Sequence, residues 1–119
     1  MKKILIVDDA EFMRMTIRNI LEPKGYDVVS EAESIEEALK KYQQFKPDLV
    51  TMDIVILGGN GIKAVKKILR FDSLAKILMI SALGQQELII DAIHAGAKGF
   101  VIKPFKPEQI LAEVKRIIG

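Results

Sequence analysis

The sequence has no cysteine, no tryptophan and no long hydrophobic run. A chain without cysteine forms neither a disulfide framework nor a thiolate metal site, which suits a reducing compartment, and we expect a cytoplasmic protein. No stretch approaches the roughly 20 apolar residues that span a membrane. The short apolar segment near the N-terminus also lacks the cleavage site of a secretory signal, so we expect no membrane partner.

An excess of charge of either sign is also missing, because 18 lysines and arginines stand against 16 acids. The formal net charge of +2 gives no support for nucleic acid or an anionic membrane surface as a partner, and we expect neither. The local group Lys63, Lys66, Lys67 and Arg70 has no interleaved aromatic residues, so we interpret it as a solvated helix face. With 119 residues, half of them hydrophobic, we expect a single domain over residues 1–119 with no output domain, acting as a monomer.

Short apolar runs alternate along the chain with segments of helical hydrophobic spacing. The expected strands cover residues 3–7, 27–30, 49–53, 76–80 and 99–102, and the apolar character of the central strand continues to Leu57. Right-handed crossovers place the intervening helices on both faces of a parallel sheet. The pattern therefore predicts an α/β fold of three layers, a (βα)5 doubly wound parallel sheet.

Several polar residues stand where helices are expected to begin. Ser34 and Glu37 predict a capping box, and Asn60 is the expected N-cap of the third helix. One member of the pair Asp8 and Asp9 is expected to cap the first helix.

The fourth helix is expected to end at Gly96 and to bury one apolar stripe. That stripe holds Ile89, Ala92 and Ile93. Leu88 and Ile90 fall to either side of it, so we expect them to remain partly exposed and to mark a docking face.

Charged and hydroxyl groups follow the ends of several expected strands. Asp53 ends the central strand, Asp8 and Asp9 follow the first, Ser81 follows the fourth and Lys103 follows the last. In open parallel α/β sheets, ligands bind outside the carboxyl ends of the strands. We therefore expect these side chains to meet at one edge of the sheet and to form the functional site.

Three converging carboxylates repel one another unless a cation lies between them. Their hard oxygen atoms suit Mg2+, which takes one or two carboxylates together with phosphate oxygens. A carboxylate nucleophile, a metal, a lysine and a hydroxyl are the groups that phosphoryl transfer needs. This chemistry makes Asp53 the expected nucleophile, with Lys103 and Ser81 contacting the transferred group. Two of these residues could instead have a purely structural role. Ser81 could cap the next helix, and Asp9 could be the N-cap of the first helix.

Four stretches together resemble the receiver domain of two-component response regulators. They are LIVDDAEFMR, VTMDI, ISALGQQ and AGAKGFVIKPF, and the likeness covers essentially the whole chain. The resemblance implies a flavodoxin-like fold with strand order 2-1-3-4-5. It also implies a signalling protein that catalyses only its own phosphorylation and dephosphorylation, and not an enzyme in the ordinary sense.

The resemblance further implies a role for each site residue. Asp53 accepts a phosphoryl group from a histidine kinase, Lys103 pairs with the phosphate, and the Lys103–Pro104 bond is cis. Ser81 and Phe100 form the switch pair, and the target protein binds the fourth helix, the last strand and the last helix. The magnesium ligands are Asp8, Asp9, Asp53 and the backbone carbonyl of Val55.

Other functions remain open from the sequence. A phosphatase with an Asp nucleophile would carry a second acid two residues later, where this chain has Val55, and a flavin binder would be opposed by the Asp8–Asp9 pair. Within signalling, the resemblance favours a diffusible chemotaxis regulator of a target such as the flagellar motor switch, and the alternative is a phosphate shuttle in a relay.

One loop departs from the family pattern. Ile56-Leu57-Gly58-Gly59 replaces the usual Met-Pro stretch after the central Asp. Losing the proline frees a φ angle and restores an amide, and the glycines add conformational freedom. We expect a looser loop here and weaker magnesium binding.

Overall fold

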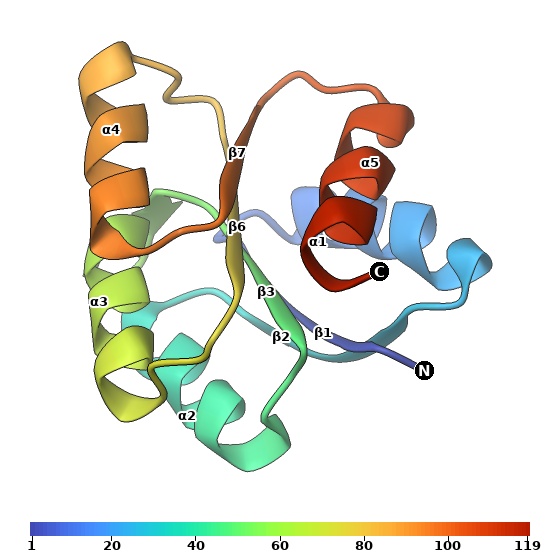
Figure 1. The fold of residues 1–119 in the computed structure, drawn as a ribbon, viewed down its shortest axis with the longest axis horizontal. Helices are drawn as coiled ribbons and strands as arrows, with labels where there is room; N and C mark the ends of the chain where they lie inside the picture. The colour runs from blue at the N-terminus through green and yellow to red at the C-terminus, as the bar shows by residue number, and fades with distance from the viewer.

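The computed structural model describes residues 1–119, which form a five-stranded parallel sheet of order β2-β1-β3-β6-β7 (Figure 1). Counting only these five strands along the chain, the order is 2-1-3-4-5, as the resemblance implied. The strands of this sheet are β1 (Lys3–Val7), β2 (Asp27–Ala32), β3 (Leu49–Met52), β6 (Ile77–Ser81) and β7 (Gly99–Ile102). The predicted α/β architecture is confirmed.

Helices cover both faces of the sheet, which gives the three predicted layers (Figure 1). The helices are α1 (Glu11–Leu21), α2 (Ile35–Phe45), α3 (Gly61–Phe71), α4 (Gln86–Ala95) and α5 (Pro107–Ile118), with a short 3-10 turn η1 (Glu22–Lys24) after α1. One buried cluster joins α2, α3 and α4 to the sheet, and a second joins α1 and α5 to its other face. No helix combines the length and apolar character needed to cross a bilayer.

The central strand is shorter than its apolar run suggests. β3 ends at Met52, and the chain then forms a two-residue antiparallel pair, β4 (Val55–Ile56) with β5 (Gly59–Asn60). Ile54 and Ile56 are buried while Leu57 is half exposed. The expected strand over residues 49–53 is therefore one residue longer than β3, and the apolar run beyond it enters the β4–β5 pair, where Gly58 and Gly59 take positive φ values that turn the chain back on itself.

Two backbone hydrogen bonds hold this β4–β5 hairpin to the turn before α2. The N–H of Leu57 donates to the carbonyl of Glu33 at 3.0 Å, and the N–H of Ile35 donates to the carbonyl of Leu57 at 3.0 Å. The loop therefore has defined contacts, and its greater looseness relative to a Met-Pro loop remains a prediction.

The predicted caps are largely present. The amide of Glu37 donates to Ser34 Oγ and the amide of Lys63 donates to Asn60 Oδ1, both at 3.0 Å. Neither Asp8 nor Asp9 caps α1, whose N-cap is Ala10 without a side-chain bond. That expectation is wrong by one or two residues, because the aspartates remain in the loop before the helix.

The buried stripe of α4 differs from the prediction. Ala92 is fully buried and Leu88 packs against the core, whereas Ile93 is 43% exposed and Ile90 is 44% exposed. Residues 88, 92 and 95 form the inward face at i, i+4 and i+7. The predicted burial of Ile93 is wrong because a helix this rich in aliphatic residues offers more than one apolar stripe.

Candidate functional site

The predicted site residues meet at the carboxyl edge of the sheet. β1 delivers Asp8, β3 delivers Asp53, and β7 delivers Lys103. The amide of Asp53 donates to the carbonyl of Val7, and the amide of Asp8 donates to the carbonyl of Ala32, both at 3.0 Å. The ladder bonds of the sheet thus continue past the strand ends and fix the backbone of both acids.

Lys103 lies between two of these carboxylates. Its Nζ donates to Asp8 Oδ2 at 2.7 Å and to Asp53 Oδ2 at 2.8 Å. Asp8 and Asp53 are buried, and the lysine side chain is only 14% exposed. Three groups that lie 45 and 50 residues apart along the chain are therefore joined in one charged cluster.

Asp9 completes an acidic triad with Asp8 and Asp53. One carboxylate oxygen from each residue lies within 4.8 Å of the others, a spacing at which a single cation can contact all three. Asp9 is exposed while its two neighbours are buried, so the triad opens to solvent on the Asp9 side. Hard oxygen ligands in this number suit Mg2+.

Burial and neighbouring charges have opposite effects on the pKa values of Asp8 and Lys103. Burial raises the pKa of the Asp8 carboxyl, and hydrogen bonds from Lys103 and from the Ala10 amide offset this only in part. Burial alone would lower the pKa of Lys103, but its hydrogen bonds to Asp53 and Asp8 raise it. The lysine is therefore a fixed cation at physiological pH.

The remaining predicted residues surround this cluster. Ser81 is the last residue of β6, and its buried Oγ accepts a hydrogen bond from the Leu83 amide at 3.2 Å. Phe100 is half buried against the α2–α3–α4 core. The amide of Val55 donates to Asp53 Oδ1 at 3.2 Å, so the Val55 peptide lies beside the central acid.

The end of β7 brings Lys103 to its place. The amide of Lys103 donates to the carbonyl of Ser81 at 2.9 Å. The peptide bond between Lys103 and Pro104 is cis, in agreement with the resemblance.

Sequence reasoning missed three residues at this site. A Cβ atom on Gly61 would stand 2.0 Å from the carbonyl oxygen of Asp53, so only glycine fits there. Arg14 Nη1 donates to the carbonyl of Asp8 at 2.7 Å. Thr51, buried two residues before Asp53, has a hydroxyl without a hydrogen-bond partner. Neither the arginine on an amphipathic helix nor the threonine inside a strand carries a sequence signal for these contacts.

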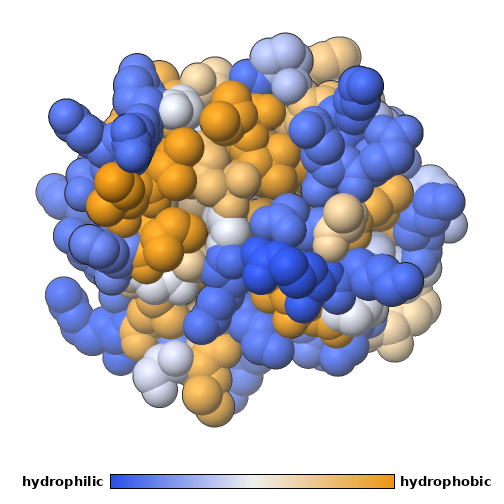
Figure 2. All heavy atoms as spheres, turned by 45° about the horizontal axis from the view of Figure 1, so that its top comes forward, coloured by the Kyte–Doolittle hydropathy of each residue, from blue (hydrophilic) through white to orange (hydrophobic).

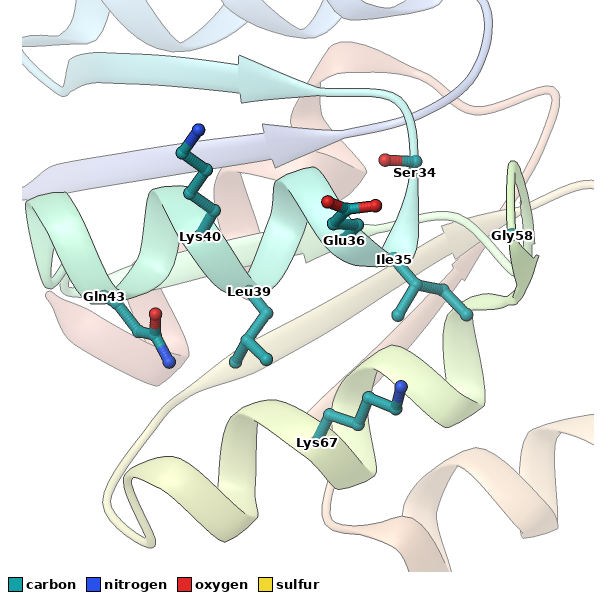
Figure 3. A pocket seen from close by; sticks show the side chains of 8 residues that line it. All are labelled: Ser34, Ile35, Glu36, Leu39, Lys40, Gln43, Gly58 and Lys67. Carbon is teal, nitrogen blue, oxygen red and sulfur yellow. The ribbon is translucent and has the colours of Figure 1, made fainter.

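The acidic triad is distinct from the hollow between α2 and α3. That hollow has a volume of about 560 Å³, with Ile35 and Leu39 on its apolar side and Lys40 and Lys67 at its border (Figure 3). None of the predicted site residues lines it. The site is thus recognised by its chemistry and not by a deep cavity.

Comparison with known proteins agrees with this arrangement. The sequence model of the protein family 'response regulator receiver domain' matches residues 4–115. The chain belongs to the response regulator receiver domain family. Receiver domains are signalling modules of two-component systems, and the resemblance read from the sequence is confirmed.

Chemotaxis regulators are among the proteins similar to this receiver domain. It is 50% identical over 117 residues to chemotaxis protein CheY of Bacillus subtilis, with 98% of each chain covered. It is 48% identical over 116 residues to CheY of Thermotoga maritima, covering 98% of this chain and 97% of that protein. The receiver domain is thus close to the CheY proteins.

A solved structure shows the same fold. The CheX–CheY–BeF3–Mg2+ complex from Borrelia burgdorferi superposes with a TM-score of 0.95 at 34% identity, covering 99% of this chain and 90% of that one. In that protein, CheY is bound to a beryllofluoride group, magnesium and a protein partner.

Proposed function

We propose that this receiver domain takes a phosphoryl group from a histidine kinase onto Asp53. One carboxylate oxygen of Asp53 attacks the phosphorus of a phosphohistidine. The new O–P bond forms as the P–N bond breaks, and the electron pair of that bond stays on the imidazole nitrogen. The product is an acyl phosphate, which adds about −1.5 to −2 charges at the strand end.

Mg2+ is the proposed cofactor of this transfer. Asp8, Asp9, Asp53 and the backbone carbonyl of Val55 would hold it, and the mutual approach of the three carboxylates within 4.8 Å supports this ligand set. When bound, the ion offsets negative charge on the phosphoryl oxygens.

Lys103 and Ser81 are the proposed partners of the new phosphoryl group. Lys103 already lies 2.8 Å from Asp53 Oδ2, so its ammonium can pair with an anion formed on that carboxylate. Ser81 ends the neighbouring strand β6, from which its hydroxyl can donate to the phosphoryl group. Reorientation of Ser81 would leave space for Phe100, and we propose this pair as the switch.

The output surface in this proposal consists of α4, β7 and α5. Ile90, Ile93 and Ile102 on these elements are each more than 40% exposed, which gives the surface an apolar character that a protein partner can bury. In Figure 2, as in Figure 1, α4 lies on the left. Apolar side chains gather on that side of the view among hydrophilic ones. The similarity to CheY proteins favours a cytoplasmic chemotaxis regulator acting on a target such as the flagellar motor.

One observation carries the proposal above all others. Lys103 is bonded to Asp8 and Asp53 at once, with Asp9 in reach of both acids. Three acids and one lysine leave a net charge of about −2, which a divalent cation offsets before the phosphoryl group is transferred.

Beryllofluoride with Mg2+ provides the direct test. We expect amide NMR signals of residues 81–84 and 100–103 to shift when both are added, since beryllofluoride mimics a phosphoryl group on an aspartate. Asp53→Asn should abolish these shifts, while Asp27→Asn, which alters an exposed acid at the far end of β2, should retain them. Equal shifts in the Asp53→Asn variant would refute the proposal.

A further inference from the structure

Arg14 joins the site loop to a neighbouring strand. Its Nη1 donates to the backbone carbonyl of Asp8 at 2.7 Å, and its Nε donates to Glu31 Oε1 on β2 at 2.8 Å. The side chain is only 14% exposed. The guanidinium therefore spans from the acidic triad to the sheet and uses two of its donors in fixed directions.

Glu31 is itself held from a second direction. Arg18, one turn further along α1, donates from Nε and Nη2 to Glu31 Oε2 at 2.9 and 2.8 Å. Each oxygen of Glu31 thus serves a different arginine. Arg18 makes no hydrogen bond to Asp8, so Arg14 is the member of this group that is bonded to the site.

The peptide that Arg14 holds sets the direction of Asp9. The carbonyl of Asp8 belongs to the peptide plane between Asp8 and Asp9, and that plane fixes where the Asp9 side chain starts. Asp8 has its own restraints, from Lys103 and from the amide of Ala10. The Asp9 carboxylate is exposed and accepts no hydrogen bond, so the backbone alone places it.

We propose that Arg14 is a positioning residue for magnesium, acting through the Asp8–Asp9 peptide to hold Asp9 within reach of Asp8 and Asp53. This inference rests on the proposed magnesium site and assigns to it a residue that contacts neither metal nor phosphate. Groups that orient metal ligands in this way commonly change metal affinity by about 10- to 100-fold when they are removed.

The positive charge of Arg14 would affect magnesium affinity in the opposite direction from its hydrogen bond to Asp8. The direction of the change in affinity therefore tests the proposal. A cation near a metal site repels the metal, so loss of the guanidinium charge alone would tighten magnesium binding. Loss of the hydrogen bond to Asp8 would loosen it. Lysine at this position keeps the charge but lacks the planar fork that serves Asp8 and Glu31 together.

Magnesium affinity, measured by calorimetry on the full chain, separates these effects. The variants are Arg14→Met, Arg14→Lys and the control Arg18→Met, which removes the same charge and the other pair of bonds to Glu31. Urea unfolding of each variant measures stability separately. We expect both Arg14 variants to raise the magnesium Kd about tenfold, and Arg18→Met to lose stability with its magnesium Kd within about twofold of wild type.

Each other outcome overturns the inference in a recognisable way. Unchanged or tighter binding by Arg14→Met shows that Arg14 acts only through charge or stability. Equal weakening by Arg18→Met assigns the effect to folding and not to the Asp8 carbonyl. If the wild-type chain itself binds no magnesium, the proposed function fails together with this inference, whereas the first two outcomes leave the proposed function intact.

Discussion

At the scale of single residues, Gly61 lies against the backbone that carries the proposed phosphoryl acceptor. A Cβ atom there would stand 2.0 Å from the Asp53 carbonyl oxygen and 2.8 Å from its carbonyl carbon. The amide of Gly61 also donates to the carbonyl of Ile54 at 2.7 Å. The first residue of α3 therefore fixes how closely the helix approaches the site.

Gly61→Ala should push the Asp53 peptide out of place. Alanine favours helices, so any loss must come from the contact, and we expect the free energy of unfolding to fall by about 2 kcal/mol. Beryllofluoride should bind the variant more weakly, as measured by NMR titration with Mg2+. Gly25→Ala is the matched control, because a Cβ atom there meets nothing within 4 Å and only its φ of +90° is strained. Equal beryllofluoride affinity in wild type and Gly61→Ala would contradict this role.

Thr51 offers a second residue whose substitution has a predicted sign. Its buried hydroxyl has no hydrogen-bond partner, and such a group costs about 1–3 kcal/mol. Thr51→Val should raise the free energy of unfolding by about 1 kcal/mol in urea denaturation. Thr16→Val removes a hydroxyl that donates to the Phe12 carbonyl and should bring no gain. A destabilised Thr51→Val variant would show that the hydroxyl has a partner in solution.

At the scale of elements, the β4–β5 hairpin is tied to the site because it begins two residues after Asp53. Proline at residue 57 would fix φ, but it would also remove the N–H that donates to the Glu33 carbonyl. From the family pattern we expect the wild-type loop to be looser, so Leu57→Pro should bind Mg2+ more tightly in a calorimetric titration. Equal or weaker Mg2+ binding by the variant would show that the hydrogen bond to Glu33 already restrains the loop as a proline would.

The contact between α1 and β2 predicts a dependence on pH. Burial alone would raise the pKa of Glu31, but the hydrogen bonds from Arg18 and Arg14 lower it below its ordinary value of 4.5. Because its pKa is lower in the folded than in the unfolded chain, Glu31 stabilises the fold at pH values above its unfolded-state pKa. This stabilisation is lost as the pH falls through its folded-state pKa.

Glu31→Gln should therefore lower the free energy of unfolding near neutral pH by about 1–2 kcal/mol. We expect this difference from wild type to shrink as the pH falls below 4.5 and Glu31 becomes protonated. Urea denaturation across this pH range measures the difference, with Glu33→Gln as the control, because the exposed Glu33 carboxylate makes no hydrogen bond or ion pair. A difference that stays constant at low pH would contradict the ion-pair origin.

The sequence predicts element types better than element faces and ends. The β-branched runs and the caps at Ser34 and Asn60 give local signals, and the structure confirms them. In α4, however, the aliphatic residues surround much of the helix, so spacing alone does not decide that Ile93 faces solvent. The β4–β5 hairpin was missed because its turn depends on positive φ at two glycines and on backbone bonds to a distant turn.

At the scale of the whole molecule, topology explains why the site could be expected before the structure. Parallel strands place all their carboxyl ends at one edge, so Asp8, Asp53 and Lys103 had to approach one another if the strands were assigned correctly. The contacts of Arg14 and Gly61 could not be expected in the same way. They depend on how far each helix sits from the sheet, which is set by the packing of the two cores.

In the proposed function, Asp8, Asp9 and Lys103 meet around Asp53, and Asp53 alone carries the phosphoryl group. Treatment with a small phosphodonor and Mg2+, reduction with borohydride and peptide mass spectrometry would locate the group, because reduction converts an aspartyl phosphate to homoserine. We expect homoserine at residue 53 and nowhere else, with none formed when Mg2+ is withheld. Homoserine at Asp8 or Asp9, or labelling of the Asp53→Asn variant, would contradict it.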